Sequence, residues 1–282
     1  MKRVLFTIIL FLSFCISVNA LTGYAYCPDD EEPVNMRKGP STSSDLIGSG
    51  ITCNDTVEIL NENPGSDWYQ IKYKDLTFNI KPMGFKHTGL FPEQAVNWDW
   101  MIDKIKNAKR EIKVLNLFAY TGGATVACAA AGASVCHVDS SKGMVTWAKE
   151  NIASSGLAER PVRYIVDDVV KFVNREIRRG NKYDAIIMDP PSYGRGANGE
   201  VWQFEDNIYD LVDLCTKVLS DKPLFFLINS YTTGISSKVL ENILNLTVSK
   251  NYKGKVSSGE VGLPMENSNL VLPCGIFGRW EN

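Results

Sequence analysis

This chain of 282 residues has few histidines, no closely spaced pair of cysteines and no excess of positive charge. It has two histidines, and its seven cysteines form no Cys-x-x-Cys pair of the kind that binds zinc, so we expect no metal site. The net charge is −2, whereas many nucleic-acid-binding domains are basic. Hydrophobic residues make up 44% of the chain, which indicates an ordinary globular protein with one large or two modest domains.

The first 20 residues differ from the rest. A positively charged start precedes an almost wholly apolar run, and small residues stand at positions 18 and 20. This pattern predicts a secretory signal peptide, which is too short for a stable membrane span. Cys27 and Cys53 could pair in an oxidising compartment, whereas Cys128, Cys136, Cys215 and Cys274 are expected to be small buried hydrophobic residues.

Residues 21–75 contain short strand-like runs separated by Gly, Pro and Ser turns, which favours a small β-barrel. The stretch Val-Asn-Met-Arg-Lys-Gly-Pro-Ser (34–41), followed by Trp-Tyr (68–69), resembles the bacterial-type SH3 domain. That resemblance implies a spacer or a module that binds cell-wall peptides.

From residue 113 onward, strand-like and helix-like patterns alternate, which is typical of a doubly wound α/β sheet. The expected strands are 113–118, 134–138, 162–166, 185–188 and 223–228, and the expected helices are the stretch before 131, 142–154, 169–179, 207–219 and 236–245. Residues 255–260 and 271–277 are predicted to form an antiparallel pair at the sheet edge.

The most informative segment is residues 182–195, where a short apolar run ends in Asp189 and two prolines. Proline cannot continue a strand, so Asp189 should stand at a rigid turn on the carboxyl edge of the sheet, where open α/β sheets bind ligands. The acid could also belong to a plain strand-terminating turn. Asp189, the Pro190 carbonyl and Tyr193 could together accept protons from an amino group and stack on a flat base.

The turn after the first expected strand has adjacent glycines, Gly122 and Gly123, and lacks the Gly-x-Gly-x-x-Gly pattern of dinucleotide-binding turns. Glycine lets the backbone approach a ligand closely. Asp139 closes the next strand, where a carboxylate can accept both hydroxyls of a ribose. His137, in the same strand, is expected to be a buried core histidine.

Five motifs over about 200 residues make residues 76–282 resemble the class I S-adenosylmethionine-dependent methyltransferases, and more closely the bacterial group that modifies large-subunit ribosomal RNA. They are Thr-Gly-Leu-Phe-Pro-Glu-Gln (88–94), Leu-Asn-Leu-Phe-Ala-Tyr-Thr-Gly-Gly (115–123), His-Val-Asp-Ser-Ser (137–141), Val-Asp-Asp-Val (166–169) and Met-Asp-Pro-Pro-Ser-Tyr (188–193). The resemblance implies a Rossmann-like sheet of seven strands.

The resemblance also implies roles in binding S-adenosylmethionine. The backbone of Phe118, Ala119, Tyr120 and Gly122 would hold its methionine part, and Asp139, with Ser140 beside it, would bind the ribose. Asp168 would accept from the adenine amino group, although it could equally be the N-cap of the following helix. Gln94 would close the site from the N-terminal side, and Asp189 would complete it.

Relatives that methylate carbon 5 of cytosine need a cysteine nucleophile after the fourth or fifth strand, and none stands at 191–192 or 229–231. The chain is therefore expected to methylate a nitrogen of a base in RNA. The alternatives are a methyltransferase for a protein or small molecule and a secreted cell-wall-binding module carrying a passenger methyltransferase fold. The expected compartment is in conflict, because S-adenosylmethionine is intracellular and the signal peptide implies export.

Overall fold

The computed structural model describes residues 21–26, 35–37, 46–49, 56–59, 68–81, 83, 88–195, 201–265 and 270–282. The predicted signal peptide, Cys27 and Cys53 lie outside these residues, as does most of the segment on which the SH3-like prediction depends. Both interpretations stay predictions. Within the described part of the chain, every helix is too short or too polar to span a bilayer.

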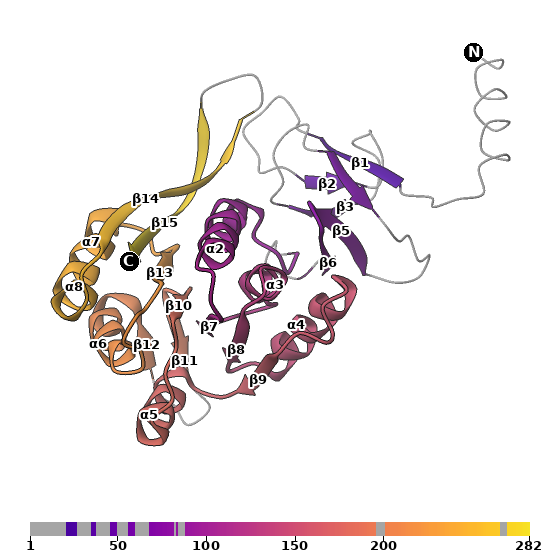
Figure 1. Ribbon diagram of the computed structural model, residues 1–282. Helices are drawn as coiled ribbons and strands as arrows, with labels where there is room; N and C mark the ends of the chain where they lie inside the picture. The colour runs from indigo at the N-terminus through magenta and orange to yellow at the C-terminus, as the bar shows by residue number, and fades with distance from the viewer. Residues whose placement is uncertain are drawn as a thin grey trace, which may run out of the picture.

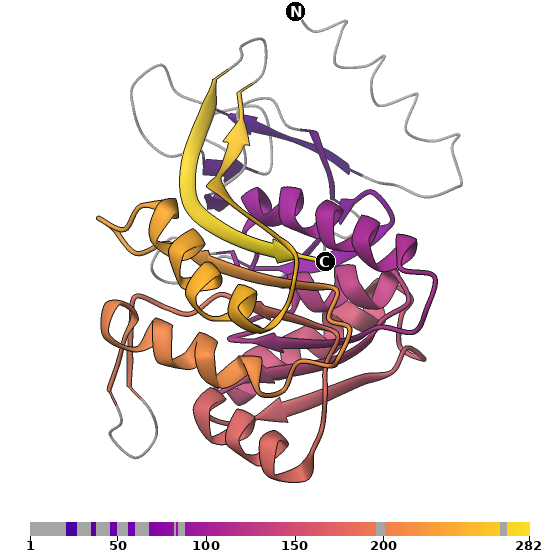
Figure 2. The ribbon, with the colours of Figure 1, turned by 60° about the vertical axis from the view of Figure 1, so that its left-hand side comes forward.

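The centre of the molecule is a seven-stranded sheet with the order β14-β15-β13-β10-β7-β8-β9 (Figure 1). Its strands are β7 (Lys113–Leu117), β8 (Ser134–Asp139), β9 (Val162–Val166), β10 (Ala185–Met188), β13 (Phe225–Ser230), β14 (Lys255–Pro264) and β15 (Val271–Glu281). The five strands from β13 to β9 run parallel, and β15 and β14 are antiparallel to their neighbours. The predicted antiparallel pair at the edge is confirmed, and Figure 2 shows it arching away from the sheet.

Helices cover both faces of this sheet (Figure 1). One face carries α2 (Ala95–Asn107), α3 (Gly123–Ala130) and α4 (Lys142–Ser154); the other carries α5 (Val169–Arg179), α6 (Phe204–Thr216), α7 (Ser237–Leu246) and the short α8 (Val248–Asn251). Strand β10 is apolar throughout because alternate side chains enter different cores. Ala185 and Ile187 join the α2–α3 side, and Ile186 and Met188 join the α5–α7 side.

The N-terminal strands β1 (Leu21–Tyr26), β2 (Asn35–Arg37), β3 (Leu46–Ser49), β4 (Thr56–Ile59), β5 (Tyr69–Tyr73) and β6 (Leu76–Ile80) form an antiparallel sheet with the order β3-β2-β1-β4-β5-β6. The predicted domain boundary between residues 75 and 76 falls in the turn between β5 and β6. Tyr69 and Phe78, one from each strand, share a core with Trp98 of α2. The division at this position stays a prediction.

Two local features differ from expectation. Helix α6 begins at Phe204, earlier than the predicted 207, because its apolar positions include Phe204 itself, which is fully buried. The segment after the diproline, for which no strand was predicted, forms a small antiparallel arm of β11 (Tyr193–Arg195) and β12 (Val201–Gln203). Trp202 anchors this arm, since its Nε1 donates to the Pro191 carbonyl at 2.7 Å.

Candidate functional site

The turn between β7 and α3 has an unusual backbone. Phe118 and Tyr120 have φ values of 53° and 49°, a region that L-residues with side chains rarely adopt. Gly122 follows with φ 85°, and a Cβ there would lie 2.8 Å from the Cβ of Ala148 on α4. Such strain persists only where surrounding packing imposes it, and it concentrates at ligand sites. The turn therefore brings a strained stretch of backbone to the carboxyl edge of the sheet.

Asp139, the last residue of β8, holds this turn in place. Its Oδ2 accepts from the Tyr120 backbone N–H at 2.9 Å, and its Oδ1 accepts from the Ser141 N–H at 2.8 Å. Burial raises the pKa of Asp139, and the two backbone donors oppose that rise. Each carboxylate oxygen keeps acceptor capacity beyond its one backbone donor, so the group can still receive hydroxyl donors from a ligand.

Asp168 stands at the end of the next parallel strand. Its Oδ1 accepts from the Lys171 N–H at 2.8 Å, which confirms the N-cap role considered for it. Asp167 links the end of β9 to the end of β8, since its N–H donates to the Asp139 carbonyl at 3.1 Å. The capping bond occupies one oxygen of Asp168, and its role in binding a ligand stays a prediction.

Asp189 follows β10 at the same edge. Burial raises the pKa of its carboxyl to about 7, and the nearby Glu93 adds to that rise. Pro190 is buried behind it. Tyr193 lies on the exposed arm with 53% of its surface accessible, and its hydroxyl accepts from Arg195 Nε at 2.8 Å.

A crevice opens where β7 and β10 lie side by side in the centre of the sheet. This is the point at which the chain winds in opposite directions, and such points bind ligands in open α/β sheets. The lining residues are Leu90, Phe91, Gln94, Trp98, Asn116, Phe118, Ala119, Tyr120, Thr121, Gly123, Ala124, Ile187, Asp189 and Asn229.

Five of the predicted site residues meet in this crevice: Gln94, Phe118, Ala119, Tyr120 and Asp189. The other six do not line it. Asp139 and Asp168 stand at the neighbouring strand ends, and the remaining four are Gly122, Ser140, Pro190 and Tyr193. The predictions therefore fall on one edge of the sheet.

Asn229 of the crevice, and Asn97 and Tyr231 in the same set of hydrogen bonds, were not predicted as site residues. Gln94 donates to the Tyr231 hydroxyl at 2.7 Å, and Asn97 donates both to Gln94 at 2.8 Å and to Asn229 at 2.9 Å. Asn229 and Tyr231 come at the end of β13, so they carry the same strand-end signal as Asp189. Asn97 carries no such signal, because its role comes from the packing of α2 across the sheet.

His137 is fully buried, as expected of a core histidine. Its Nδ1 lies 2.9 Å from the hydroxyl of Thr125, and its Nε2 has no hydrogen-bond partner. Burial lowers the pKa of the ring to about 4, so it is neutral at physiological pH. The expectation is confirmed for its position, although only one of its two nitrogens is satisfied.

The cysteines follow expectation in three of the four described cases. Cys128, Cys136 and Cys215 are buried, whereas Cys274 on β15 is partly exposed. The prediction that all four are buried is wrong for Cys274, because it lies on the part of β15 beyond its pairing with β13. No group of three or more His, Cys, Asp or Glu among the described residues could hold a metal ion.

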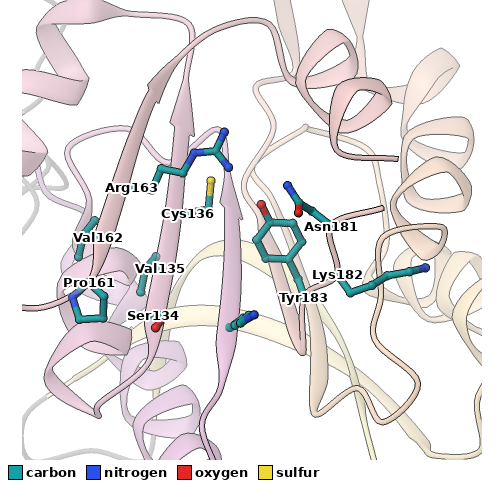
Figure 3. Close-up of a pocket in the computed structure, with 10 residues that line it drawn as sticks. Ser134, Val135, Cys136, Pro161, Val162, Arg163, Asn181, Lys182 and Tyr183 are labelled. Carbon is teal, nitrogen blue, oxygen red and sulfur yellow. The ribbon is translucent and has the colours of Figure 1, made fainter. Parts of the chain in front are cut away.

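A larger cavity lies at the opposite, amino edge of the sheet (Figure 3). It has a volume of about 440 Å³, compared with about 60 Å³ for the crevice. Figure 3 shows the Cys136 sulfur between Arg163 and Tyr183. Burial raises the pKa of this thiol to about 11, and the Tyr183 hydroxyl is bound to Glu176 at 2.7 Å. Size alone does not identify a functional site. The Cys136 thiol is protonated, and the Tyr183 hydroxyl is already bonded to Glu176, so these groups do not mark the cavity as a reactive site.

Comparison with known proteins identifies the family to which the chain is similar. A family model described as S-adenosylmethionine-dependent methyltransferase matches residues 48–236. The crystal structure of the SAM-dependent methyltransferase from Agrobacterium tumefaciens is 37% identical, with a TM-score of 0.75, over 85% of this chain and 77% of that one. The structure of SMU.776 complexed with SAH has a TM-score of 0.63 at 20% identity, over 80% of this chain and 58% of that one, which shows the fold alone.

Curated relatives carry the name ribosomal RNA large subunit methyltransferase K/L. The protein from Shewanella frigidimarina (strain NCIMB 400) is 32% identical over 58% of this chain and 21% of its own length. The protein from Shewanella sp. (strain MR-4) is 29% identical over 62% of this chain and 26% of its own length. The matches thus span about a quarter or less of these relatives.

Proposed function

Because this chain belongs to the S-adenosylmethionine-dependent methyltransferase family, we propose that it transfers a methyl group to a nitrogen of a base in RNA. The observation that carries the proposal is the place of Asp189. Its carboxyl stands in the crevice at a rigid diproline turn, and its pKa is raised to about 7. A group with that pKa can exchange a proton with an amino or ring nitrogen near neutral pH.

S-adenosylmethionine is the methyl donor, and the residues around the crevice fit it. When bound, it supplies a methyl group that its sulfonium charge has already activated. We propose that the strained backbone from Phe118 to Gly122 holds the methionine part and that Asp139 accepts from the ribose hydroxyls. The enclosed space of about 60 Å³ takes only part of such a molecule, so Asp139 and the exposed Ser140 would form an open shelf for the remainder.

The remaining predicted contacts are part of the same proposal. Asp168 would accept from the adenine amino group with the carboxylate oxygen that does not cap α5. Gln94 would close the crevice from the side of α2, where its amide is held between Asn97 and Tyr231.

A calorimetric titration with S-adenosylmethionine tests the cofactor assignment. Asp139→Ala is expected to bind it about 10- to 100-fold more weakly, because hydrogen bonds to a charged group contribute about 1.5–3 kcal/mol. Asp213→Ala, which removes an exposed carboxylate on α6, is the matched control and should bind normally. Equal affinities in the two variants would contradict the assignment.

For the acceptor, we propose that the Asp189 carboxylate and the Pro190 carbonyl accept hydrogen bonds from the base while Tyr193 stacks on its face. The exposed ring of Tyr193 on β11 supports this, since an exposed aromatic next to an acidic turn can cover a flat ligand. Trp202, which donates to Pro191 and contacts the ring of Phe118 at 5.4 Å between centroids, supports the turn from the other side.

The crevice favours nitrogen over cytosine carbon 5. None of its lining residues is a cysteine, and carbon 5 requires a thiol that adds to the ring. RNA as the acceptor class is supported by the ribosomal RNA relatives, whose names refer to proteins much longer than the matched region. The basic residues Lys113 and Arg110 do not contribute to the crevice, because Lys113 begins β7 at the opposite edge and Arg110 is paired with Asp184 at 2.8 Å.

The experiment is mass spectrometry of nucleosides from total bacterial RNA incubated with the full chain and S-adenosylmethionine. We expect one N-methylated nucleoside, absent from a reaction with Asp189→Asn. Formation of 5-methylcytosine would contradict the nitrogen assignment. Methylation of protein but not of RNA would move the acceptor to another class.

We also propose that the protein acts in the cytoplasm, because S-adenosylmethionine is an intracellular metabolite. The apolar N-terminal segment predicts export instead. Fractionation of cells that express the full chain, followed by determination of its N-terminal residue, decides between the two. Protein recovered outside the cell without its first 20 residues would overturn the proposal.

A further inference from the structure

A row of polar side chains, most of them buried, connects β15 to the crevice. Arg279 donates from Nε to the Asn97 Oδ1 at 3.2 Å, and its Nη2 donates to the same oxygen. The guanidinium also lies over two aromatic rings, with distances to the ring centroids of 4.6 Å for Trp100 and 4.2 Å for Phe277. Burial lowers the pKa of Arg279 to about 10, so it remains a cation at neutral pH.

This cation sets the direction of every hydrogen bond that follows. An arginine has donors only, so the oxygen of Asn97 must face it and the Asn97 NH₂ must point away. That NH₂ donates to Gln94 Oε1 and Asn229 Oδ1, which turns the Gln94 NH₂ toward Tyr231. Because the Tyr231 oxygen accepts from Gln94, its own hydrogen is left to donate elsewhere.

The Tyr231 hydroxyl donates to Glu93, a buried carboxylate of the short 3₁₀ helix η2 (Pro92–Gln94). A hydrogen bond to a carboxylate stabilises its ionised form. The negative charge of Glu93 acts in turn on Asp189 across the edge of the sheet, second only to burial in raising the pKa of that group. The row therefore begins at a cation and ends at two neighbouring carboxyl groups.

We propose that Glu93 is a positioning residue for Asp189: the row of hydrogen bonds from Arg279 keeps Glu93 ionised, and Glu93 in turn makes Asp189 the group that takes the proton of the acceptor nitrogen. The inference rests on the proposed function for the acceptor, and it narrows that acceptor to a nitrogen that bears a hydrogen. A carboxyl with an ordinary pKa would be a much weaker base at neutral pH than Asp189.

The proton balance is simple. The acceptor nitrogen forms a bond to the methyl carbon, and the carbon–sulfur bond breaks with its electron pair remaining on sulfur. The nitrogen would then carry an extra proton, which passes to the Asp189 carboxylate and later to water. A ring nitrogen without hydrogen would have no proton to give, and Glu93 would then have no effect on the rate.

The other titratable groups around the pair come from three elements. Tyr231 follows β13, and burial together with Asp189 and Glu93 raises its pKa, so it stays protonated as a donor. Cys274 of β15 also has a raised pKa, by burial and by Glu93. Tyr120, after β7, has a raised pKa through burial and Asp139. Each of these groups is neutral at physiological pH, and Glu93 is the group that adds to burial in raising the pKa of Asp189.

A carbon-detected NMR titration of the side-chain carboxyl groups tests the inference on the full chain without RNA or cofactor. Wild-type Asp189 should titrate near neutral pH. In Glu93→Gln it should titrate at clearly lower pH, because the neighbouring charge is gone. In Tyr231→Phe the carboxylate of Glu93 loses its donor, so Glu93 should gain proton affinity and Asp189 should again titrate lower. An unchanged Asp189 titration in Glu93→Gln would overturn the inference.

Glu205→Gln, which removes an exposed carboxylate from the first turn of α6, is the matched control and should leave Asp189 unchanged. Arg279→Met tests the start of the row and should lower the Asp189 titration as Tyr231→Phe does. Backbone amide spectra establish that each variant folds. If Arg279→Met proves unfolded, the Glu93→Gln and Tyr231→Phe titrations still decide the matter.

The rate of methyl transfer to RNA as a function of pH separates this inference from the function it rests on. The wild-type rate should rise with pH through about 7 as Asp189 ionises, and the rise should move to lower pH in Glu93→Gln. A shifted titration with no methylated RNA would leave the coupling of the two carboxyls intact and remove the proposed acceptor. If both proteins methylate RNA with the same pH profile, the proposed acceptor would stand and the effect of Glu93 on Asp189 would be refuted.

Discussion

Gly122 and Asp139 both hold the turn after β7, but through different forces. Asp139 acts by two hydrogen bonds to backbone N–H groups, whereas Gly122 acts by lacking a side chain where α4 comes close. The sequence marked both residues, because a glycine turn and a strand-ending acid are recognisable patterns. It did not show the strained backbone at Phe118 and Tyr120, because that strain depends on how α4 and β8 pack against the turn.

A pair of glycine substitutions separates backbone strain from close packing. Gly132→Ala places a side chain at φ 100° with no atom within 4 Å, and should lose about 1 kcal/mol of unfolding free energy. Gly122→Ala at φ 85° adds the contact with Ala148 and should lose about 3 kcal/mol in total. Urea denaturation measures both. Similar losses of unfolding free energy in the two variants would mean that α4 shifts to make room for the added Cβ at position 122.

Asp189 should also make stability depend on pH. Its pKa in the folded protein is about 7, above the ordinary value of 3.8, so the folded state holds the proton more tightly than the unfolded state. This contribution is fully present below pH 3.8 and is lost as pH rises through 7. Asp189→Asn should therefore be more stable than wild type at pH 8 and similar to it near pH 4. Thermal melts at the two values measure this; a wild-type advantage at pH 8 would contradict the shift.

Elements far apart in the sequence meet around α4. Asn151 of this helix accepts from the Asn79 backbone N–H of β6 at 2.7 Å and donates to the Thr121 carbonyl in the glycine turn at 2.8 Å. Trp147, one turn earlier, donates to the Asn79 carbonyl at 2.7 Å. The helix was predicted with its observed bounds, but these contacts were not, because the helical pattern says which positions are buried and not what they touch.

Loss of this bridge should be costly. Asn151→Ala removes the partners of the half-buried Asn79 N–H and of the buried Thr121 carbonyl, and we expect a loss of about 2–5 kcal/mol of unfolding free energy. Asn107→Ala, at the exposed end of α2, removes one hydrogen bond to Asp103 and should change stability by less than about 1 kcal/mol. Chemical denaturation distinguishes them. Equal effects would show that β6 and the turn hold their places without Asn151.

At the scale of the whole molecule, the β5–β6 hairpin is packed into the methyltransferase fold. Tyr69 and Ile71 of β5 are 7% and 6% exposed and belong to the same core as Phe78 and Trp98. The sequence placed these residues with the preceding β-rich segment, because their composition and turn spacing match it. Strand pattern alone does not say which core a strand enters.

Two fragments test where the fold begins. Residues 68–282 should be more stable than residues 76–282 by several kcal/mol, because each buried side chain of this size contributes about 1.5–3 kcal/mol. Denaturation midpoints of the two fragments, with titration by S-adenosylmethionine, measure this. If residues 76–282 were equally stable, the predicted boundary between 75 and 76 would be supported.

The sequence by itself determined the alternation of strands and helices, the antiparallel edge and the edge of the sheet at which the candidate site residues stand. Those features follow from hydrophobic periodicity and from residues that end strands, both of which are local. Only the tertiary structure decided that Arg279, Asn97 and Tyr231 form one row ending at Glu93. Arg279 and Asn97 are separated by 182 positions, and hydrogen-bond partners at such separation are chosen by how α2 and β15 pack against the sheet.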